Sequence, residues 1–244
     1  MGNFSIVVPG TTSVAVSAPG FIPMTTASQD VVVTAPSISW VGLPGDVGSG
    51  LQTESLRAGL SVTTHGGVTV RIESTDPDLV LVSAAEDEPG QTYVDVEVDD
   101  GGMWAYFYAH GMDDTTGSVT ITAAAPGFES SGAVIDVVEP ALDIQDIGTS
   151  VDVSDPPDEF AIRVGLGDAS FTRVDRAQKR RVGAPPLVAT VSSSVPAAAE
   201  LMTLADTSGT VTVEIDPGAS ESPPTRAEGG IALNGLAVGQ TIVS

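Results

Sequence analysis

Apolar residues in this chain occur in short runs in which they alternate with polar residues. A period of two is typical of half-buried β-strands, because successive side chains point to opposite faces of a sheet. The runs are residues 13–17, 31–34, 68–72, 93–98, 118–122 and 210–215. Prolines and glycines stand between them, as turns require. No sustained helical period is present, and the one helix candidate, residues 173–181, is polar all round. We therefore predict an all-β chain built from antiparallel sandwiches.

The sequence also repeats itself, with its blocks in a constant order. Residues 13–21 recur as 118–128, and the Val-rich stretch 31–36 recurs as 134–140. Three further matches join 56–60 to 162–166, 94–99 to 211–216, and 105–111 to 230–235, with 4–10 as another copy of the last block. One unit therefore spans about a hundred residues, the size of an immunoglobulin-like sandwich.

These repeats divide the chain into three parts. Residues 37–140 form a complete unit, and residues 141–244 form a second unit that lacks its closing strands. Residues 1–36 match such closing strands, with no unit in front of them. Three explanations stay open: a segment of a longer tandem array, closure of the second unit by residues 1–36 of another copy, or closure by residues 1–36 of the same chain. Closure between copies would give a head-to-tail filament.

Four blocks of the repeat carry a likeness to known proteins. They are an Asp-Pro strand opening, an acidic strand, an aromatic strand, and a Val-Thr-Ile strand with an Ala-Pro-Gly-Phe turn, at residues 74–83, 94–98, 107–111 and 117–128. In these blocks the chain resembles the bacterial immunoglobulin-like tandem repeats of surface and secreted proteins. The resemblance implies tandem immunoglobulin-like sandwiches in a spacer, adhesive or scaffold role, at the cell surface or outside the cell. The second unit departs from it, since Ile231 and Leu233 replace the aromatics.

Charge and composition narrow the function. The 244 residues include 9 Lys and Arg against 32 Asp and Glu, a formal charge of −23, and no cysteine. Such a surface repels nucleic acid, and no apolar stretch approaches the ~18 residues of a membrane span. The absence of cysteine excludes disulfides and thiol chemistry. The two histidines, His65 and His110, lie beside turn glycines without a nucleophile motif, so we predict that the chain is not an enzyme.

Carboxylates gather near the start of the second unit. The candidate metal ligands are Asp143, Asp146, Asp152, Asp155, Asp158 and Glu159. Hard cations such as calcium prefer oxygen ligands of this kind, and calcium is the one cofactor that the sequence suggests. Aspartate is also an ordinary turn residue, so a solvated acidic surface is the alternative.

Positive charge is concentrated in one insertion. Five of the nine cationic residues lie there, namely Arg173, Arg176, Lys179, Arg180 and Arg181. The offset between matching blocks rises from 106 to 117 across this segment, which makes it a long loop of the second unit. We predict that it docks on an acidic surface, such as a second copy of the chain or another surface protein. Neutralisation by nearby carboxylates of the same chain is the alternative.

Aromatic residues cluster on one strand. Trp104, Tyr106 and Tyr108 share one face, opposite Phe107. If exposed, that face could stack on a glycan or anchor an interface; if buried, it would be core. Taken together, the sequence favours a non-enzymatic structural protein: a building block of an extracellular filament, layer or adhesin stalk that self-associates through strand pairing and complementary charge. A ligand- or glycan-binding adhesion module is the alternative.

Overall fold

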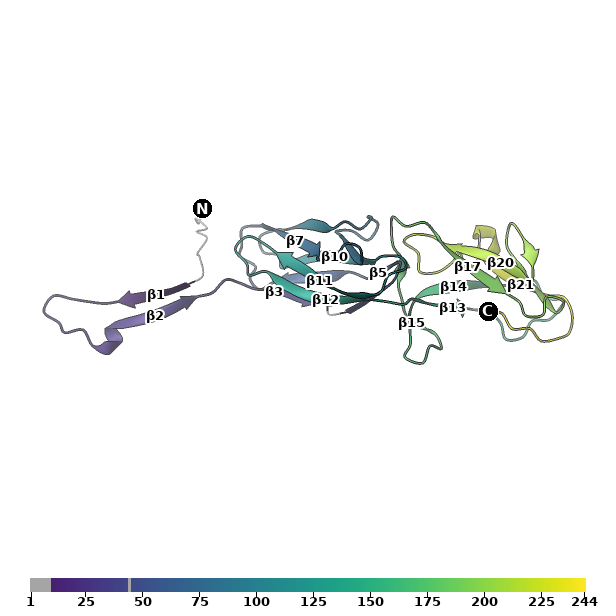
Figure 1. The fold of residues 1–244 in the computed structure, drawn as a ribbon, viewed down its shortest axis with the longest axis horizontal. Helices are drawn as coiled ribbons and strands as arrows, with labels where there is room; N and C mark the ends of the chain where they lie inside the picture. The colour runs from purple at the N-terminus through teal and green to yellow at the C-terminus, as the bar shows by residue number, and fades with distance from the viewer. Residues whose placement is uncertain (1–9, 44) are drawn as a thin grey trace.

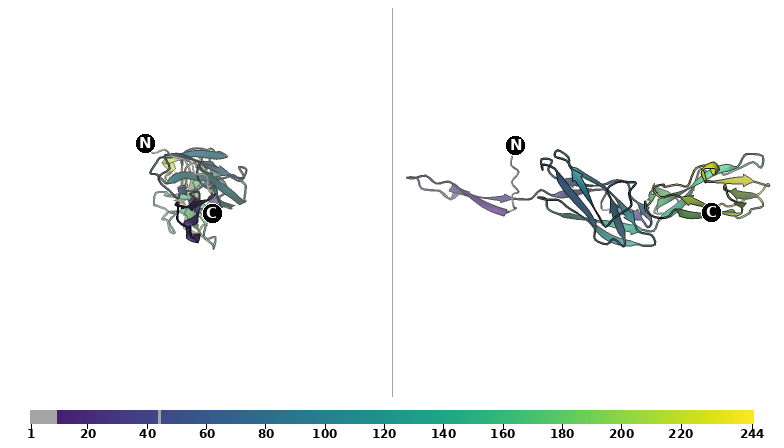
Figure 2. Two further views of the ribbon diagram at one scale, coloured as in Figure 1. Left: turned by 90° about the vertical axis from the view of Figure 1, so that its left-hand side faces the viewer. Right: turned by 90° about the horizontal axis from the view of Figure 1, so that it is seen from above.

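The computed structural model describes residues 10–43 and 45–244, and in them the chain is all-β, as predicted. A hairpin, a first sandwich and a second sandwich follow one another along the long axis of the molecule (Figures 1 and 2). The sequence block 4–10 lies outside the described residues except for Gly10. No helix among the described residues is long and apolar enough to cross a membrane.

The hairpin consists of β1 (Gly10–Ala15) and β2 (Ser28–Val33), joined by a loop that contains the short 3-10 helix η1 (Thr25–Ala27). Its two strands pair with each other and with no other described strand. It extends away from the first sandwich, at the end of the molecule opposite the second sandwich (Figure 1).

The first sandwich packs two sheets against each other. One contains β3 (Ile38–Val41), β5 (Leu51–Gln52), β6 (Leu56–Leu60), β8 (Val80–Ser83) and β10 (Trp104–Gly111). The other has the order β4 (Gly45–Gly48), β12 (Ser131–Val138), β11 (Gly117–Ala124), β7 (Val68–Ser74) and β9 (Tyr93–Val98). The alternation seen in the sequence places every second residue inward, so that Phe107, Ile121 and Ile135 are fully buried between the sheets.

The second sandwich has a separate buried cluster that includes Phe160, Leu201, Ile215 and Ile231. Its larger sheet contains β13 (Ala141–Gln145), β14 (Asp158–Gly167), β15 (Val174–Ala177), β18 (Ala199–Met202), β19 (Thr207–Ser208) and β21 (Ile231–Gly235). Its other sheet is the pair β17 (Leu187–Ser192) and β20 (Thr210–Ile215). A short 3-10 helix, η2 (Arg226–Glu228), precedes β21.

Matching blocks of the sequence pair in matching registers. Ile72 of β7 lies opposite Val94 of β9, and Val191 of β17 lies opposite Val211 of β20. The sandwiches differ in what lies at the second edge of β7 and of β17, the edge away from β9 and from β20. Strand β7 pairs there with β11, whereas β17 is bordered by the last four residues, through a single bridge between Ser193 and Val243.

Candidate functional site

The best-defined candidate site is the joint between the two sandwiches, where the basic insertion meets the first sandwich. Residues 173–181, the helix candidate of the sequence, contain β15 and the short strand β16 (Lys179–Arg180) instead. Strand β16 runs antiparallel to β5, with Lys179 opposite Gln52 and Arg180 opposite Leu51. The insertion of the second sandwich therefore adds a strand to a sheet of the first. Leu51 in turn packs into the core of the second sandwich.

Two buried glutamines lock this strand pairing. The Gln178 side chain accepts a hydrogen bond from the Gly48 N–H at 2.8 Å and donates one to the Asp46 carbonyl at 3.1 Å. The Gln52 side chain accepts from the Val182 N–H at 3.0 Å and donates to the Glu86 carbonyl at 3.0 Å. Each amide thus uses both its donor and its acceptor, which lets a polar side chain be buried without an unpaired group.

Two adjacent arginines of the insertion, Arg180 and Arg181, form ion pairs with one carboxylate of the first sandwich, Asp113. The Arg180 guanidinium is buried and donates to the Gly50 carbonyl at 2.9 Å, to the Pro185 carbonyl at 3.0 Å and to Asp113. Arg181 donates to the other oxygen of Asp113, with its Nε at 2.8 Å. Partial burial raises the pKa of Asp113, but the hydrogen bonds from Arg181 and Arg180 outweigh it and hold that pKa below its ordinary value. Asp113 is therefore ionised at neutral pH and paired with two cations.

The backbone at this point requires glycine. Gly50 has a φ of +74°, a left-handed conformation that other residues adopt at a cost, and a Cβ there would lie 2.3 Å from the Arg180 Nη1. The closeness of backbone and guanidinium is what lets Arg180 reach the Gly50 carbonyl. A side chain at position 50 would therefore displace Arg180 from Asp113.

The remaining predicted cations form exposed ion pairs. Arg176 pairs with Asp46 at 3.4 Å, Lys179 with Glu86 at 2.7 Å, and Arg173 with Asp175 at 3.5 Å. With Arg180 and Arg181, four of the five predicted residues meet carboxylates of the first sandwich in the same chain. These pairs match the alternative of neutralisation within the chain. Docking of the insertion on a second copy stays a prediction.

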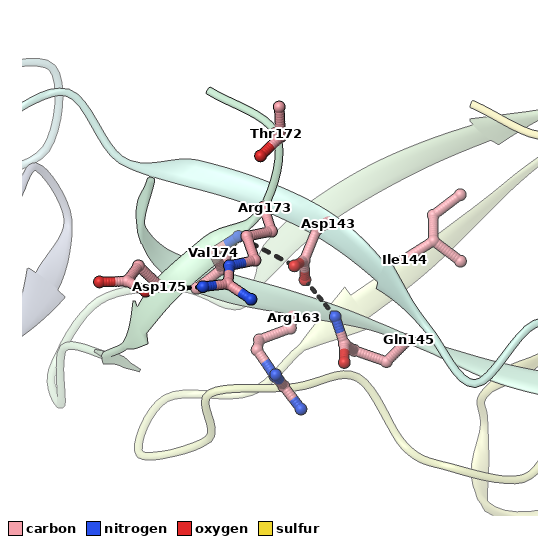
Figure 3. Close-up of a pocket in the computed structure, with 8 residues that line it drawn as sticks. All are labelled: Asp143, Ile144, Gln145, Arg163, Thr172, Arg173, Val174 and Asp175. Atoms are coloured by element: carbon pink, nitrogen blue, oxygen red, sulfur yellow. Dashed lines mark hydrogen bonds and ion pairs between the residues drawn. The ribbon is translucent and has the colours of Figure 1, made fainter. Parts of the chain in front are cut away.

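The carboxylates predicted as metal ligands are held mainly by donors of their own neighbourhood. Asp143 accepts from the Gln145 amide at 2.7 Å and the Val174 N–H at 2.9 Å, in a shallow pocket that also holds Arg163 and Arg173 (Figure 3). Arg163 itself pairs with Glu221 at 2.7 Å. Charged groups that line the pocket are thus paired with other groups of the protein.

The other five candidates lie along the chain that follows. Asp152 accepts from Ser154, whose N–H and hydroxyl both donate to it, and Asp155 accepts from the Asp152 N–H. Asp158 accepts from the Gly148 N–H and Glu159 from the Arg226 N–H, while Asp146 takes a φ of +65° in the turn after β13. Within residues 10–43 and 45–244, no group of three or more His, Cys, Asp or Glu side chains is placed to hold a metal ion. Calcium binding here stays a prediction.

The two faces of the aromatic strand β10 have different surroundings. Phe107 points into the core, where the Trp40 ring packs edge-on against it with the two ring centroids 6.1 Å apart. On the outer face the Arg57 guanidinium lies 5.3 Å from the Trp104 ring centroid and 5.9 Å from that of Tyr106. Tyr108 is half-buried. The outer aromatic surface is thus shared with a cation of its own chain.

The two histidines have structural partners. His65 lies in the turn before β7. Its Nδ1 accepts a hydrogen bond from the Gly67 N–H, and its Nε2 lies 3.1 Å from the Gly102 carbonyl oxygen. His110 is fully buried, with its Nε2 2.8 Å from the Ser83 hydroxyl. Since that hydroxyl donates its proton to the Ala85 carbonyl at 2.7 Å, the His110 Nε2 is the donor and cannot act as a base toward Ser83. Burial, and to a smaller extent the positive charge of nearby Arg181, lower the pKa of His110 to about 4.

Sequence reasoning found the insertion but missed the residues that receive it. Length and charge pointed to residues 173–181, whereas Leu51, Gln52 and Asp113 occupy positions that look like ordinary strand and turn residues. Gln178 carries no sequence signal of its own. A buried polar network of this kind depends on a contact between distant segments, which the local sequence does not display.

Comparisons with known proteins leave the family of this chain open. No protein-family model matches it, and no curated protein matches it. Among solved structures it is similar to domains 4 and 5 of the S-layer protein SbsC, with a TM-score of 0.30 and 20% identity over 54% of this chain and 67% of that one. It also matches SbsC domains 1–6, with a TM-score of 0.33 and 16% identity, covering 85% of this chain and 25% of that one. The calcium-binding domain CBD12 of CALX1.1 matches with a TM-score of 0.27 and 13% identity over 75% and 72%. Likenesses this loose assign no function.

Proposed function

We propose that this chain is a non-enzymatic structural protein, a stiff building block of an extracellular or cell-surface filament, layer or adhesin stalk. Its units are residues 1–36, 37–140 and 141–244, and it associates with further copies or with other surface proteins. The proposal rests on the joint. Tandem domains move relative to each other unless their interface is strong, and here a strand of one sandwich extends a sheet of the other.

The joint favours stiffness for a physical reason. Bending it would break the β5–β16 pairing and expose Gln52, Gln178 and Arg180, all of which are buried and hydrogen-bonded. Each of these hydrogen bonds contributes about 0.5–1.5 kcal/mol of net stability when it is exchanged for a bond to water, and about 1.5–3 kcal/mol when it involves a charged group. A building block that transmits force or sets a repeat distance needs such a joint, whereas a simple tether does not.

Electron microscopy of single particles tests this proposal. The angle between the two sandwiches should form one narrow distribution in the unmodified chain. It should broaden in the double variant Gln178→Ala, Asp113→Ala, and stay narrow in the control Asp78→Ala, which alters an exposed turn of the first sandwich. A broad distribution in the unmodified chain would reject a stiff building block.

The alternative, a glycan-binding adhesion module, has less support. A glycan stacks on an aromatic face that is free, and Arg57 lies over both Trp104 and Tyr106. Calcium would act in the proposed role as a stiffening ion near the start of the second sandwich. A calcium titration tests it: a rise in melting temperature that Asp152→Asn removes supports binding, and an unchanged melting temperature rejects it.

A further inference from the structure

The two outer faces of the first sandwich carry different kinds of side chain. The strands β3, β5, β6, β8 and β10, which form one sheet, contain no Asp and no Glu. In the opposite sheet the outward positions of β7, β9 and β12 carry four carboxylates, namely Glu73, Asp95, Glu97 and Asp136. The strands of one sheet thus present no negative charge in a chain that is otherwise rich in it, while the other outer face is acidic.

Arg57 lies on the face without carboxylates and has no acidic partner. It is in β6, with Val41 of β3 opposite it on one side and Tyr106 of β10 on the other. Ion pairs join seven of the nine Lys and Arg side chains to carboxylates, and Arg57 and Arg226 are the other two. All 32 Asp and Glu residues lie within residues 10–43 and 45–244, so the lack of a partner for Arg57 holds for every one of them.

The matching arginine of the second sandwich is neutralised within the chain. The repeat that joins residues 56–60 to 162–166 makes Arg163 the counterpart of Arg57, and Arg163 pairs with Glu221 at 2.7 Å. In the first sandwich the rings of Trp104 and Tyr106 take the place of such a carboxylate. Aromatic rings hold a guanidinium in position but offer no oxygen acceptor to its N–H groups. The donors of Arg57 are therefore left for a group from outside.

A glycine makes room for the aromatic part of this face. Trp104 lies opposite Gly59 of β6, and a Cβ at position 59 would lie 2.6 Å from the Trp104 Cζ3 and 3.0 Å from the Ser39 Oγ. A residue without a side chain is thus what lets the indole lie over β6, next to Arg57. The arrangement exists before any partner binds, which lowers the entropy lost on association.

The composition of this face is that of a protein interface. Trp, Tyr and Arg are the residue types that contribute most to binding energy between proteins, whereas Asp and Glu are depleted there. Tyr106 is 47% exposed and Val41 is 38% exposed, so the patch is accessible around the guanidinium. An unpaired guanidinium between aromatic rings calls for a partner surface that supplies a carboxylate.

The acidic outer face of the same sandwich supplies such a carboxylate. Asp95 is already paired with Arg71, and Asp136 accepts from the Ser118 hydroxyl. Glu97 is exposed, lies opposite Thr69 in the β7–β9 register and forms no ion pair in the part of the chain that the structure describes. Glu97 is therefore the carboxylate of this face that is best placed to receive a cation from another molecule.

We propose that the outer face of β3, β6 and β10 in one copy docks on the outer face of β7 and β9 in a second copy, with Arg57 paired to Glu97. This assignment rests on the proposed function, because it names the surfaces through which copies associate. The two surfaces are different and lie on opposite sides of one sandwich. Such a contact continues from copy to copy and stacks the molecules side by side, as a layer or a thick filament requires.

A charge exchange followed by sedimentation tests the pairing. Salt should be raised stepwise, because it weakens the repulsion between copies that each carry a charge of −23. The unmodified chain should associate, and Arg57→Glu and Glu97→Lys should each weaken association roughly tenfold or more. A mixture of these two variants should associate again, since the swapped charges complement each other. The matched control is Glu214→Lys, which changes the exposed counterpart of Glu97 in the second sandwich and should associate as the unmodified chain does.

The aromatic part of the contact has its own test. Tyr106→Ala should weaken association roughly tenfold, because an exposed tyrosine at an interface centre is covered by the partner. Phe171→Ala is the control, since Phe171 is 90% exposed but lies on the insertion of the second sandwich. Melting curves of every variant should match that of the unmodified chain, which shows that the changes act on association and leave folding intact.

Three results would overturn the proposal: an unmodified chain that stays monomeric at every salt concentration, a mixture of the exchanged variants that associates no better than either alone, or equal losses in Tyr106→Ala and Phe171→Ala. None of these variants alters a residue of the joint. The angle between the sandwiches of one copy should therefore stay the same in all of them, and failure of this contact is distinct from failure of the stiff building block.

Discussion

The two sandwiches are built from one repeat, yet they differ in how their smaller sheets end. In the first, β7 is followed across the sheet by β11, β12 and β4. In the second, β17 has β20 on one side and four terminal residues on the other. Equal strand patterns thus give equal pairings: β7 pairs with β9 as β17 pairs with β20. The difference shows that the repeat determines local structure and that neighbouring segments determine burial.

The largest expected effect compares one position in the two sandwiches. Ile121 is fully buried between two sheets, and Val243 is its half-exposed counterpart. We expect Ile121→Ala to cost about 3–4 kcal/mol of unfolding free energy through lost burial and a cavity. Val243→Ala should cost less than about 1 kcal/mol. Trp40 and Trp104 both lie in the first sandwich, so fluorescence follows the unfolding of that sandwich directly.

Circular dichroism, which reports on both sandwiches, provides the control for this comparison. Because the joint couples the two sandwiches, Val243→Ala should shift the dichroism and fluorescence transitions slightly and together. Equal losses for the two variants would mean that the second sandwich is closed as completely as the first.

The next effect concerns the coupling of the two sandwiches. Asp113→Ala leaves the buried Arg180 without its carboxylate, which costs about 3 kcal/mol. We expect the fluorescence and dichroism transitions to separate in this variant, because the sandwiches then unfold independently. The control Asp95→Ala removes a similar ion pair with Arg71 on the exposed face of β7 and β9, and should leave the transitions together.

Protonation of Asp113 at low pH should have the same effect on the two unfolding transitions as Asp113→Ala. The folded-state pKa of Asp113 lies below its ordinary value, so its contribution to coupling is present above the unfolded-state pKa and is lost as the pH falls through the folded-state pKa. The two transitions of the unmodified chain should therefore separate at strongly acidic pH. Transitions that stay together in Asp113→Ala would show that the β5–β16 pairing alone couples the sandwiches.

Much of the fold could be predicted because it is local. Alternation located strands such as β7, β9, β11 and β20, and the Ala-Pro-Gly-Phe turn specified a hairpin twice. The face of β10 that is buried could not be predicted, because Phe107 and the pair Trp104 and Tyr106 are both apolar enough for a core. Packing against Trp40 and the position of Arg57 decided between them.

The joint could be predicted in part. Residues 173–181 stood out by charge and length, but their partners are about 65 to 130 positions away and include a carboxylate, a glycine carbonyl and an amide. Polar residues in turns and strands are common, so nothing local distinguishes Gln52 or Asp113. A long-range network of this kind becomes visible when the fold brings its members together.

The smallest effect again compares equivalent positions, His110 in β10 and Asn234 in β21, which precede Gly111 and Gly235. Burial lowers the pKa of His110 to about 4, below the ordinary 6.5, so the folded state keeps the neutral ring. The stabilisation is present above the unfolded-state pKa and is lost as the pH falls through the folded-state pKa. Between pH 7 and pH 5 the first sandwich should lose about 2 kcal/mol of stability, measured by tryptophan fluorescence. In His110→Gln, whose amide can still donate to Ser83, that loss should disappear. A loss that persists in His110→Gln would assign the pH dependence to the carboxylates of the first sandwich.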